Sequence, residues 1–121
     1  MIQGLDHIAI IISNEDNLEF YKKFGFVETR RFSRAYDTVV FMECTGNTTN
    51  SSVVLEIFID KNHPVRVSNP EAIGLRHIAF SVENLDDLNI EHEKIRTDWF
   101  GRRFTFIKDP DGQPIEIKER V

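Results

Sequence analysis

The 121-residue chain contains a single cysteine, Cys44, and no long hydrophobic run. One cysteine cannot form an internal disulfide, so a fold held together by cross-links is excluded. The apolar run 8–12 is far too short to cross a bilayer. It also follows Asp6 and His7 rather than a basic segment, which is unlike a signal peptide. We therefore expect a cytoplasmic protein without a membrane anchor.

The chain has fewer basic than acidic residues. The chain has 15 Lys and Arg against 20 Asp and Glu, a formal net charge of −5. This acidic excess argues against a general affinity for nucleic acid. The hydrophobic fraction of 40% and the ten phenylalanines exclude a disordered chain. The length fits one ordinary domain. Cys44 ends an apolar stretch and has no catalytic motif beside it, so we expect an inert thiol.

An internal repeat organises the sequence. Residues 4–10 (GLDHIAI) match residues 74–80 (GLRHIAF) at an offset of 70 positions. Each match is followed by an asparagine, Asn14 or Asn84, and then by acidic residues. Asparagine is a favoured helix N-cap, and acids are favoured in the first turn of a helix. The pattern therefore predicts a helix after the first strand of each copy.

Strand patterns follow both predicted helices. The expected strands and turns are strands 26–32, 38–43, 53–59, 104–108 and 115–118, a less regular element near Ile95, and turns at 46–50 and 109–112. This order predicts an α+β fold of two βαβββ copies, at about 1–62 and about 72–121. Two half-size copies cannot each enclose a core. We expect them to form a single domain, within one chain or across a dimer.

Glu56 is the most informative single residue. Period-two alternation in the strand 53–59 places Glu56 on one face with Val54 and Phe58. Both faces of this strand are apolar, and an unpaired carboxylate there would be costly. Glu56 therefore needs a cation, a hydrogen-bond donor or a raised pKa.

The two histidines of the repeat, His7 and His77, share one context. Each shares its strand face with an alanine two positions on, which leaves room beside the ring. Glu56 and Glu116 each lie on the last strand of a copy. A lone histidine or glutamate in a strand is usually structural. An approximate two-fold repeat, however, brings equivalent positions together, and two imidazoles with two carboxylates suit Zn, Ni, Co, Mn or Fe.

Six short motifs resemble the vicinal oxygen chelate superfamily, and more narrowly the small bacterial glyoxalase I-like (lactoylglutathione lyase-like) proteins. They are DHIA at 6–9, FY at 20–21, FGF at 24–26, LEI at 55–57, LRHIAF at 75–80 and DPDGQPIE at 109–116. The resemblance covers nearly the whole chain. The last two motifs together are specific for the superfamily but only weakly specific for a reaction.

The resemblance implies two βαβββ repeats whose curved mixed sheets surround a metal cleft, the glyoxalase/bleomycin resistance/dioxygenase fold. The implied metal ligands are His7, Glu56, His77 and Glu116, as in metal-dependent glyoxalase I. One divalent ion per site would activate a small alpha-oxygenated carbonyl compound, or its adduct with glutathione or another thiol. Glu116 or Glu56 would move the proton. A homodimer is also expected.

Three classes of function remain open. The complete ligand set favours a metal-dependent lyase or isomerase. A metal-dependent thiol transferase acting on epoxide antibiotics, or a dioxygenase, is the second class. A binding protein of the bleomycin-resistance type, which sequesters a small molecule, is the third.

The substrate residues are the least determined part of the hypothesis. Arg76, Arg102 and Arg103 are candidates to bind a substrate carboxylate. The segment 95–104 departs from the usual glyoxalase I segment, so no residue is assigned to a glutathione site. His63 and His92 lie in a loop and in a polar run, and we expect neither to take part.

Overall fold

The structure is a computed structural model and describes residues 1–46 and 52–120. It divides into two compact units, Met1–Pro64 and Val65–Val121. Except for Gly46, the turn expected at 46–50 lies outside the described residues. Among the described helices, none is long and apolar enough to span a membrane.

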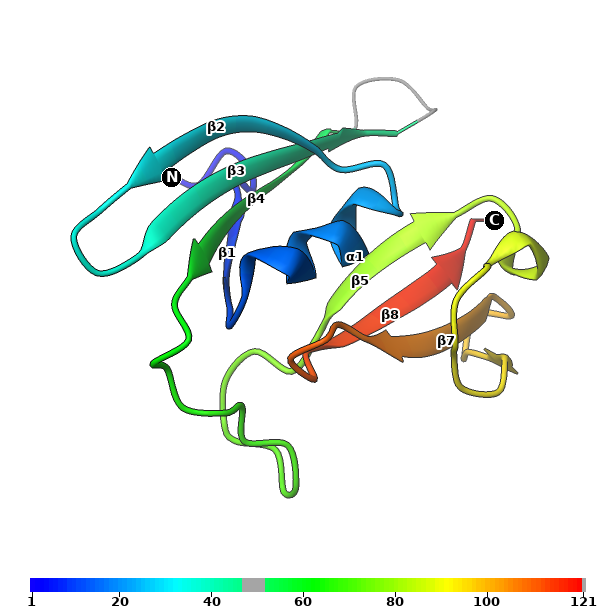
Figure 1. Cartoon of the computed structure of the whole chain (residues 1–121). Coiled ribbons are helices and arrows are strands. Elements are labelled where there is room, and N and C mark those ends of the chain that lie inside the picture. The colour runs from blue at the N-terminus through cyan, green and yellow to red at the C-terminus, as the bar shows by residue number, and fades with distance from the viewer. Residues whose placement is uncertain (47–51, 121) are drawn as a thin grey trace. The chain divides into compact units, whose positions relative to one another are not determined.

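The first unit is built on a four-stranded mixed sheet (Figure 1). Its strands lie in the order β1-β4-β3-β2, with β1 parallel to β4 and the other pairs antiparallel. The elements are β1 (Ile8–Ile12), η1 (Glu15–Asn17), α1 (Leu18–Lys22), β2 (Val27–Ser33), β3 (Thr38–Thr45) and β4 (Ser52–Ile59). The strands expected from the sequence are confirmed.

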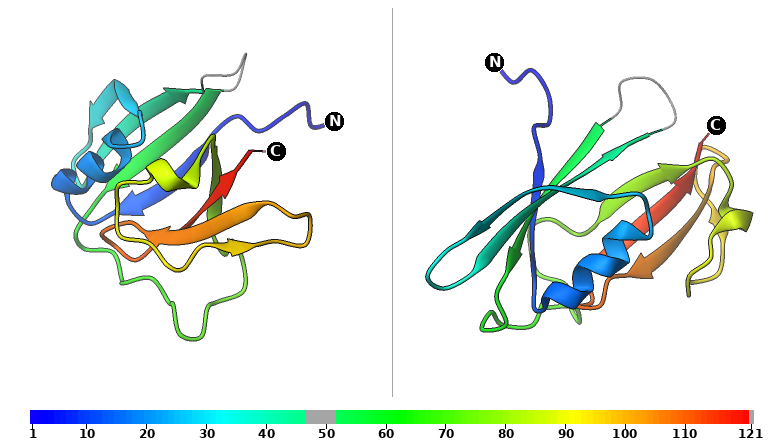
Figure 2. Two further views of the ribbon diagram at one scale, coloured as in Figure 1. Left: turned by 90° about the vertical axis from the view of Figure 1, so that its right-hand side faces the viewer. Right: turned by 45° about the horizontal axis from the view of Figure 1, so that its top comes forward.

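The second unit repeats this topology. Its strands lie in the order β5-β8-β7-β6, again with the first strand parallel to the last (Figure 2). The elements are β5 (Ile78–Val82), η2 (Leu85–Asp87), β6 (Arg96–Thr97), β7 (Arg103–Lys108) and β8 (Pro114–Glu119). Two four-stranded mixed sheets with few helices confirm the expected α+β fold with two βαβββ-like halves.

The second copy differs from the expectation in its helix. Both asparagine caps are present, since Asn14 and Asn84 accept hydrogen bonds from the backbone N–H two residues on. In the second unit, however, only the 3-10 turn η2 forms, and Leu88 already has an extended backbone. The chain then runs beside β7, where the N–H of Glu93 donates to the carbonyl of Phe106 at 3.0 Å. The polar run around His92 is therefore not part of a helix.

Alternation along the strands separates a core face from a more open face in each sheet. In the first unit Val40, Met42, Leu55 and Ile57 are completely buried. In the second unit the buried residues of the strands are Thr105, Ile107, Ile115 and Ile117. Residues of the opposite parity, including the histidines and glutamates of interest, therefore project from the other face of each sheet.

Candidate metal centre

The first unit brings His7 and Glu56 together. Strands β1 and β4 are parallel, and Ala9 lies opposite Glu56 in their register. His7 is two residues before Ala9, so it shares the face of Glu56, and the small alanine leaves room between them. The His7 Nε2 atom is 3.3 Å from Glu56 Oε1, and the side chains are 38% and 23% exposed.

The second unit brings His77 and Glu116 together by the same register. Ala79 lies opposite Glu116, two residues after the histidine. The His77 Nε2 atom is 3.0 Å from Glu116 Oε1, and these side chains are 23% and 13% exposed. On the neighbouring strand Phe106 lies opposite Glu116, and its ring meets the His77 imidazole edge-on with centroids 5.0 Å apart.

A tight turn before β8 sets this register. Asp109 is 4% exposed, and its Oδ1 accepts hydrogen bonds from the backbone N–H groups of Asp111 and Gln113, both at 2.9 Å. Gly112 has a φ of 86°, which a residue without a side chain adopts most easily. The DPDG sequence is thus a structural device that places Glu116 beside Ala79 and Phe106.

The residue before each histidine differs in charge. Asp6 Oδ2 lies 2.7 Å from His7 Nδ1, and this hydrogen bond raises the pKa of His7. In the second unit an Arg76 nitrogen lies 3.3 Å from His77 Nδ1. A guanidinium can only donate, so this contact makes Nδ1 an acceptor and leaves the ring hydrogen on Nε2, facing Glu116.

The His7–Glu56 pair fits a divalent ion. Two ligand atoms about 2.1 Å from one ion and at right angles are about 3 Å apart, close to both observed Nε2–Oε1 distances. Asp6 holds the hydrogen on Nδ1 of His7, which leaves the Nε2 lone pair free for a metal. His77 reaches the same state only when the Arg76 side chain, which is 64% exposed, turns away from Nδ1.

Each unit offers one such pair. Within either unit, the residues that the structure describes form no cluster of three or more His, Cys, Asp or Glu side chains suited to an ion. One imidazole and one carboxylate are fewer ligands than a stable transition-metal site has. Neither pair alone is therefore a complete transition-metal site.

Lys118 and Asp98 extend the second pair and were not among the predicted site residues. The Lys118 Nζ atom is 2.8 Å from Asp98 Oδ2 and 3.5 Å from Glu116 Oε2. The ammonium holds the pKa of Asp98 down at about 2, and the contact with Asp98 raises the pKa of Lys118. Lys118 is two residues after Glu116, so alternation along β8 could have identified it.

The other predicted substrate residues have structural partners. Arg103 pairs with Asp86 at 2.7 Å and with Glu119 at 3.2 Å, and it has the strand parity of the buried Thr105. The Arg102 Nε atom donates to the backbone carbonyl of Glu119 at 3.0 Å. The structure thus places only Arg76 of the three arginines beside a predicted metal ligand.

The histidines and the cysteine expected to be uninvolved belong to neither pair, although His63 lines the cavity of the first unit. His63 Nε2 is 3.6 Å from Asp60, and His92 Nδ1 is 2.6 Å from the carbonyl of Glu93. Cys44 is half-buried, and burial raises the pKa of its thiol, which makes it a poor nucleophile.

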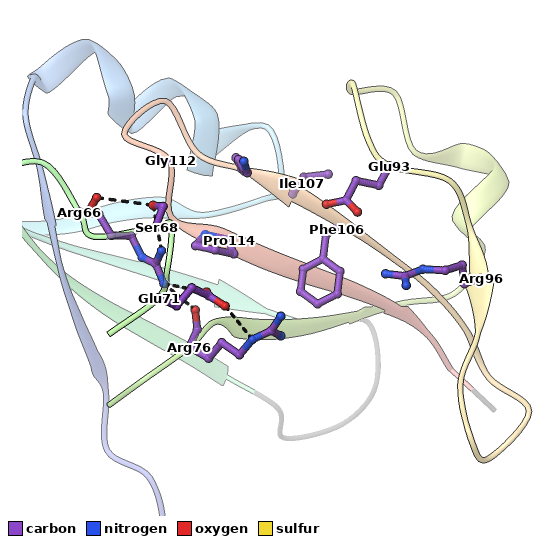
Figure 3. Close-up of a pocket in the computed structure, with 11 residues that line it drawn as sticks. Arg66, Ser68, Glu71, Arg76, Glu93, Arg96, Phe106, Ile107, Gly112 and Pro114 are labelled. Carbon is purple, nitrogen blue, oxygen red and sulfur yellow. Dashed lines mark hydrogen bonds and ion pairs between the residues drawn. The ribbon is translucent and has the colours of Figure 1, made fainter. Parts of the chain in front are cut away.

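Each sheet has a cavity on the same face as its His–Glu pair. The cavity of the first unit, about 400 Å³, is lined by Ala9, Phe58 and Arg34 among others. The cavity of the second unit, about 220 Å³, is lined by Phe106, Pro114 and several basic side chains (Figure 3). Phe58 and Pro114 each lie two positions from the glutamate of their strand. The structure thus offers each pair a neighbouring space for a small ligand.

Comparison with known proteins identifies the family. Residues 4–117 match the model of the Glyoxalase/Bleomycin resistance protein/Dioxygenase superfamily, and the chain belongs to this superfamily. It is 40% identical to the uncharacterized protein YwkD of Bacillus subtilis, with 99% of each chain covered. A glyoxalase family protein from Enterococcus faecalis is 36% identical and has a TM-score of 0.83, with 97% of this chain and 98% of that chain covered.

More distant structures share the fold alone. They include the fosfomycin resistance protein FosX of Listeria monocytogenes, with 20% identity, a TM-score of 0.69 and coverage of 100% of this chain and 96% of that chain. A lactoylglutathione lyase from Agrobacterium tumefaciens has 19% identity, a TM-score of 0.61 and coverage of 98% and 94%. The fold is therefore shared with a resistance protein and with a lyase.

Proposed function

We propose that this chain is a metal-dependent lyase or isomerase that moves a proton on a small alpha-oxygenated carbonyl compound or its thiol adduct. One divalent ion, Ni, Zn, Co, Mn or Fe, is held by His7, Glu56, His77 and Glu116. The observation that supports this proposal is the equivalence of the two His–Glu pairs. In each, an imidazole nitrogen lies about 3 Å from a carboxylate oxygen, opposite an alanine, as cis ligands of one ion do.

The chain's own residues supply the proton transfer. A divalent ion held by His7, Glu56, His77 and Glu116 would supply Lewis-acid chemistry, which would polarise the substrate carbonyl and acidify the neighbouring C–H. Glu56 or Glu116 accepts this proton and returns it to the adjacent carbon. Asp6 keeps the hydrogen of His7 on Nδ1, which fixes the tautomer that the site requires.

A transferase acting on epoxide antibiotics and a sequestering protein are the competing proposals. The FosX structure shares the fold at an identity too low to carry its activity over. A sequestering protein needs no ligand set, so two equivalent His–Glu pairs count against it. Metal content therefore separates the sequestering protein from both enzyme proposals, and a substrate screen separates the enzymes.

The first experiment is elemental analysis of purified protein reconstituted with Ni, Co, Zn and Mn. We expect one ion per His7–Glu56–His77–Glu116 set, and its loss in the variants His7→Ala and His77→Ala. The matched controls are His63→Ala and His92→Ala, which also remove an imidazole but lie outside both pairs, and they should keep the ion. Wild-type protein that binds none of these ions would overturn the proposal.

A second measurement defines the assembly and the substrate. Light scattering beside the metal analysis gives the number of chains per ion, and we propose a homodimer. Methylglyoxal is then offered with glutathione and with other thiols, and product formation is followed for the metal-loaded and metal-stripped protein. Turnover that requires both the metal and one thiol would identify the thiol cosubstrate.

A further inference from the structure

The cavity of the second unit is basic in an acidic protein. Its volume is about 220 Å³, whereas drug-sized ligands fill roughly 300–1,000 Å³. Four basic side chains line it against two carboxylates, although the whole chain has a formal net charge of −5. The basic residues are Arg66, Arg76, Arg96 and Lys108, and the acidic ones are Glu71 and Glu93. A small anion is the ligand that this charge distribution favours.

Two of these cations are already paired, whereas among the described residues Arg96 and the exposed Lys108 have no carboxylate partner. Arg66 and Arg76 share the carboxylate of Glu71, at 3.3 and 3.0 Å. Among the described residues, no carboxylate pairs with Arg96, whose guanidinium stacks on the Phe104 ring with its carbon 5.0 Å from the ring centroid. Stacking orients the guanidinium plane but leaves its N–H donors free.

Phe106 connects this cavity to the predicted metal ligands. Its ring lines the cavity and also meets the His77 imidazole with centroids 5.0 Å apart. Figure 3 shows that the side chains of Arg76 and Arg96 approach the Phe106 ring from two sides. A molecule in contact with Phe106 can therefore reach both the His77–Glu116 pair and the N–H donors of the Arg96 guanidinium group.

The arginine that lines the cavity of the first unit is already paired with a carboxylate. This residue, Arg34, is held by both carboxylate oxygens of Asp37 at 2.6 Å, and the Asp37 side chain is only 4% exposed. A bidentate, half-buried pair of this kind has few donors left for a ligand. The free positive charge is thus a feature of the second unit.

We propose that the substrate carries an oxyanion, a carboxylate or a phosphonate, which Arg96 binds in this cavity beside the His77–Glu116 pair. The planar guanidinium fork matches both groups, because each presents two oxygens to it. This inference deepens the proposed function and rests on it for the chemistry. The binding of the anion itself does not require the metal.

The test is a set of binding titrations on metal-free and metal-loaded protein. The probes are pyruvate, methylphosphonate and hydroxyacetone, a neutral analogue of similar size, and binding is followed by NMR of the backbone amides. In Arg96→Gln we expect the affinity for the anion to fall by at least about tenfold, as for a lost charge-assisted hydrogen bond. Arg96→Lys keeps the charge without the fork, so its affinity should fall between those of the wild type and the glutamine variant.

Lys94→Gln is the matched control, because it removes one positive charge from the same segment without touching the cavity lining. We expect it to change anion affinity less than twofold. Tighter binding of pyruvate or of methylphosphonate than of hydroxyacetone, lost in Arg96→Gln, supports the inference and identifies the anion. Equal or undetectable binding of all three probes in both metal states overturns it. Metal content, measured on the same samples, reports separately on the proposed function.

Discussion

The two His–Glu pairs have the same backbone geometry in opposite electrostatic surroundings. Both are set by an alanine opposite a glutamate in a parallel strand pair. The residue before the histidine is Asp6 in one unit and Arg76 in the other, and each contacts the histidine Nδ1 atom. The register of the repeat thus fixes where the candidate ligands lie. The neighbours decide the tautomer of the imidazole and the charge around it.

The two cavities also differ in their electrostatic charge. The Arg34 charge in the first unit is neutralised by a nearly buried Asp37, whereas Arg96 in the second unit stacks on an aromatic ring. The first unit therefore offers a well-oriented imidazole beside a mainly neutral space. The second offers an imidazole contacted by Arg76 beside a basic space. If the proposed function holds, we expect substrate recognition to depend mainly on the second unit.

The largest expected difference between the pairs is in catalysis. We expect one of the two variants, Glu56→Gln or Glu116→Gln, to lower turnover by about 10²–10⁴-fold with the metal retained, because it would remove the proton acceptor of the proposed reaction. The other variant should lose metal affinity instead, because an amide oxygen is a weaker ligand than a carboxylate. Turnover is measured on the substrate found in the thiol screen, with metal content determined on the same samples. Full turnover in both variants would rule out proton transfer by either glutamate.

The cores of the two units can be compared through equivalent isoleucines. Ile57 and Ile117 each follow a candidate ligand glutamate and are 0% and 1% exposed. Ile57→Ala and Ile117→Ala should each lower the free energy of unfolding by about 2–4 kcal/mol, because each leaves a cavity in a packed face. Urea unfolding measures this loss, and hydrogen exchange shows which sheet opens. A loss below about 1 kcal/mol in one variant would mean that the sheet concerned is loosely packed.

Much of this architecture could be predicted from the sequence because it depends on periodicity. The strands around Glu56 and Glu116 have clear alternation, and the 70-residue repeat identifies His7 and His77 as equivalent. These features led to both His–Glu pairs. They did not predict which of the two copies has the longer helix. Asn84 caps a turn just as Asn14 does, but the chain after Leu88 bonds to β7 instead of continuing as a helix.

Contacts between side chains on different elements were the other part that the sequence did not predict. Arg103 was a candidate substrate residue because it is basic and lies next to another arginine, Arg102. Its partners Asp86 and Glu119 lie on a different turn and strand, and no local pattern links them to it. Arg96 was not predicted for the same reason. Its stacking on Phe104 depends on the pairing of β6 with β7, which no local pattern indicates.

The contrast between Asp6 and Arg76 predicts opposite changes in metal affinity. Asp6→Asn should weaken metal binding by up to about tenfold. Loss of a carboxylate that bonds to a histidine ligand typically costs about 10–100-fold in metal affinity, and we expect the low end because Asp6 is 96% exposed. Arg76→Gln should strengthen binding a few-fold, because it removes a donor that competes for the tautomer of His77. Competition with a metal indicator dye measures both affinities. Changes of the same sign would mean that the tautomer argument fails for one of the pairs.

The same contact has a pH signature in the metal-free protein. Asp6 raises the pKa of His7 above 6.5. The contact between Asp6 and protonated His7 therefore contributes its full stability below pH 6.5, and this contribution is lost as the pH rises through the raised pKa of His7. In Asp6→Asn the pKa of His7 should fall back toward 6.5, as NMR of the imidazole resonances can show. An unchanged pKa would mean that the exposed Asp6 does not hold the ring in solution.

The smallest expected effect concerns Lys118 and Asp98, which lie beside the second pair only. The pKa of Asp98 is about 2 in the folded chain against an ordinary value of 3.8. Its contribution to stability is therefore present above pH 3.8 and is lost as the pH falls from 3.8 through about 2. Asp98→Asn keeps the side-chain oxygen that accepts the N–H groups of Phe100 and Arg102, so it removes mainly the ion pair with Lys118.

We expect Asp98→Asn to be slightly less stable than the wild type at pH 7 and equally stable near pH 2. Urea unfolding across this range measures the difference. Lys118→Met serves as the control, because it removes the same ion pair from the other side and should show the same pH dependence. A difference that persists unchanged at pH 2 would mean that Asp98 acts through its backbone hydrogen bonds. The electrostatic environment of Glu116 would then not depend on this pair.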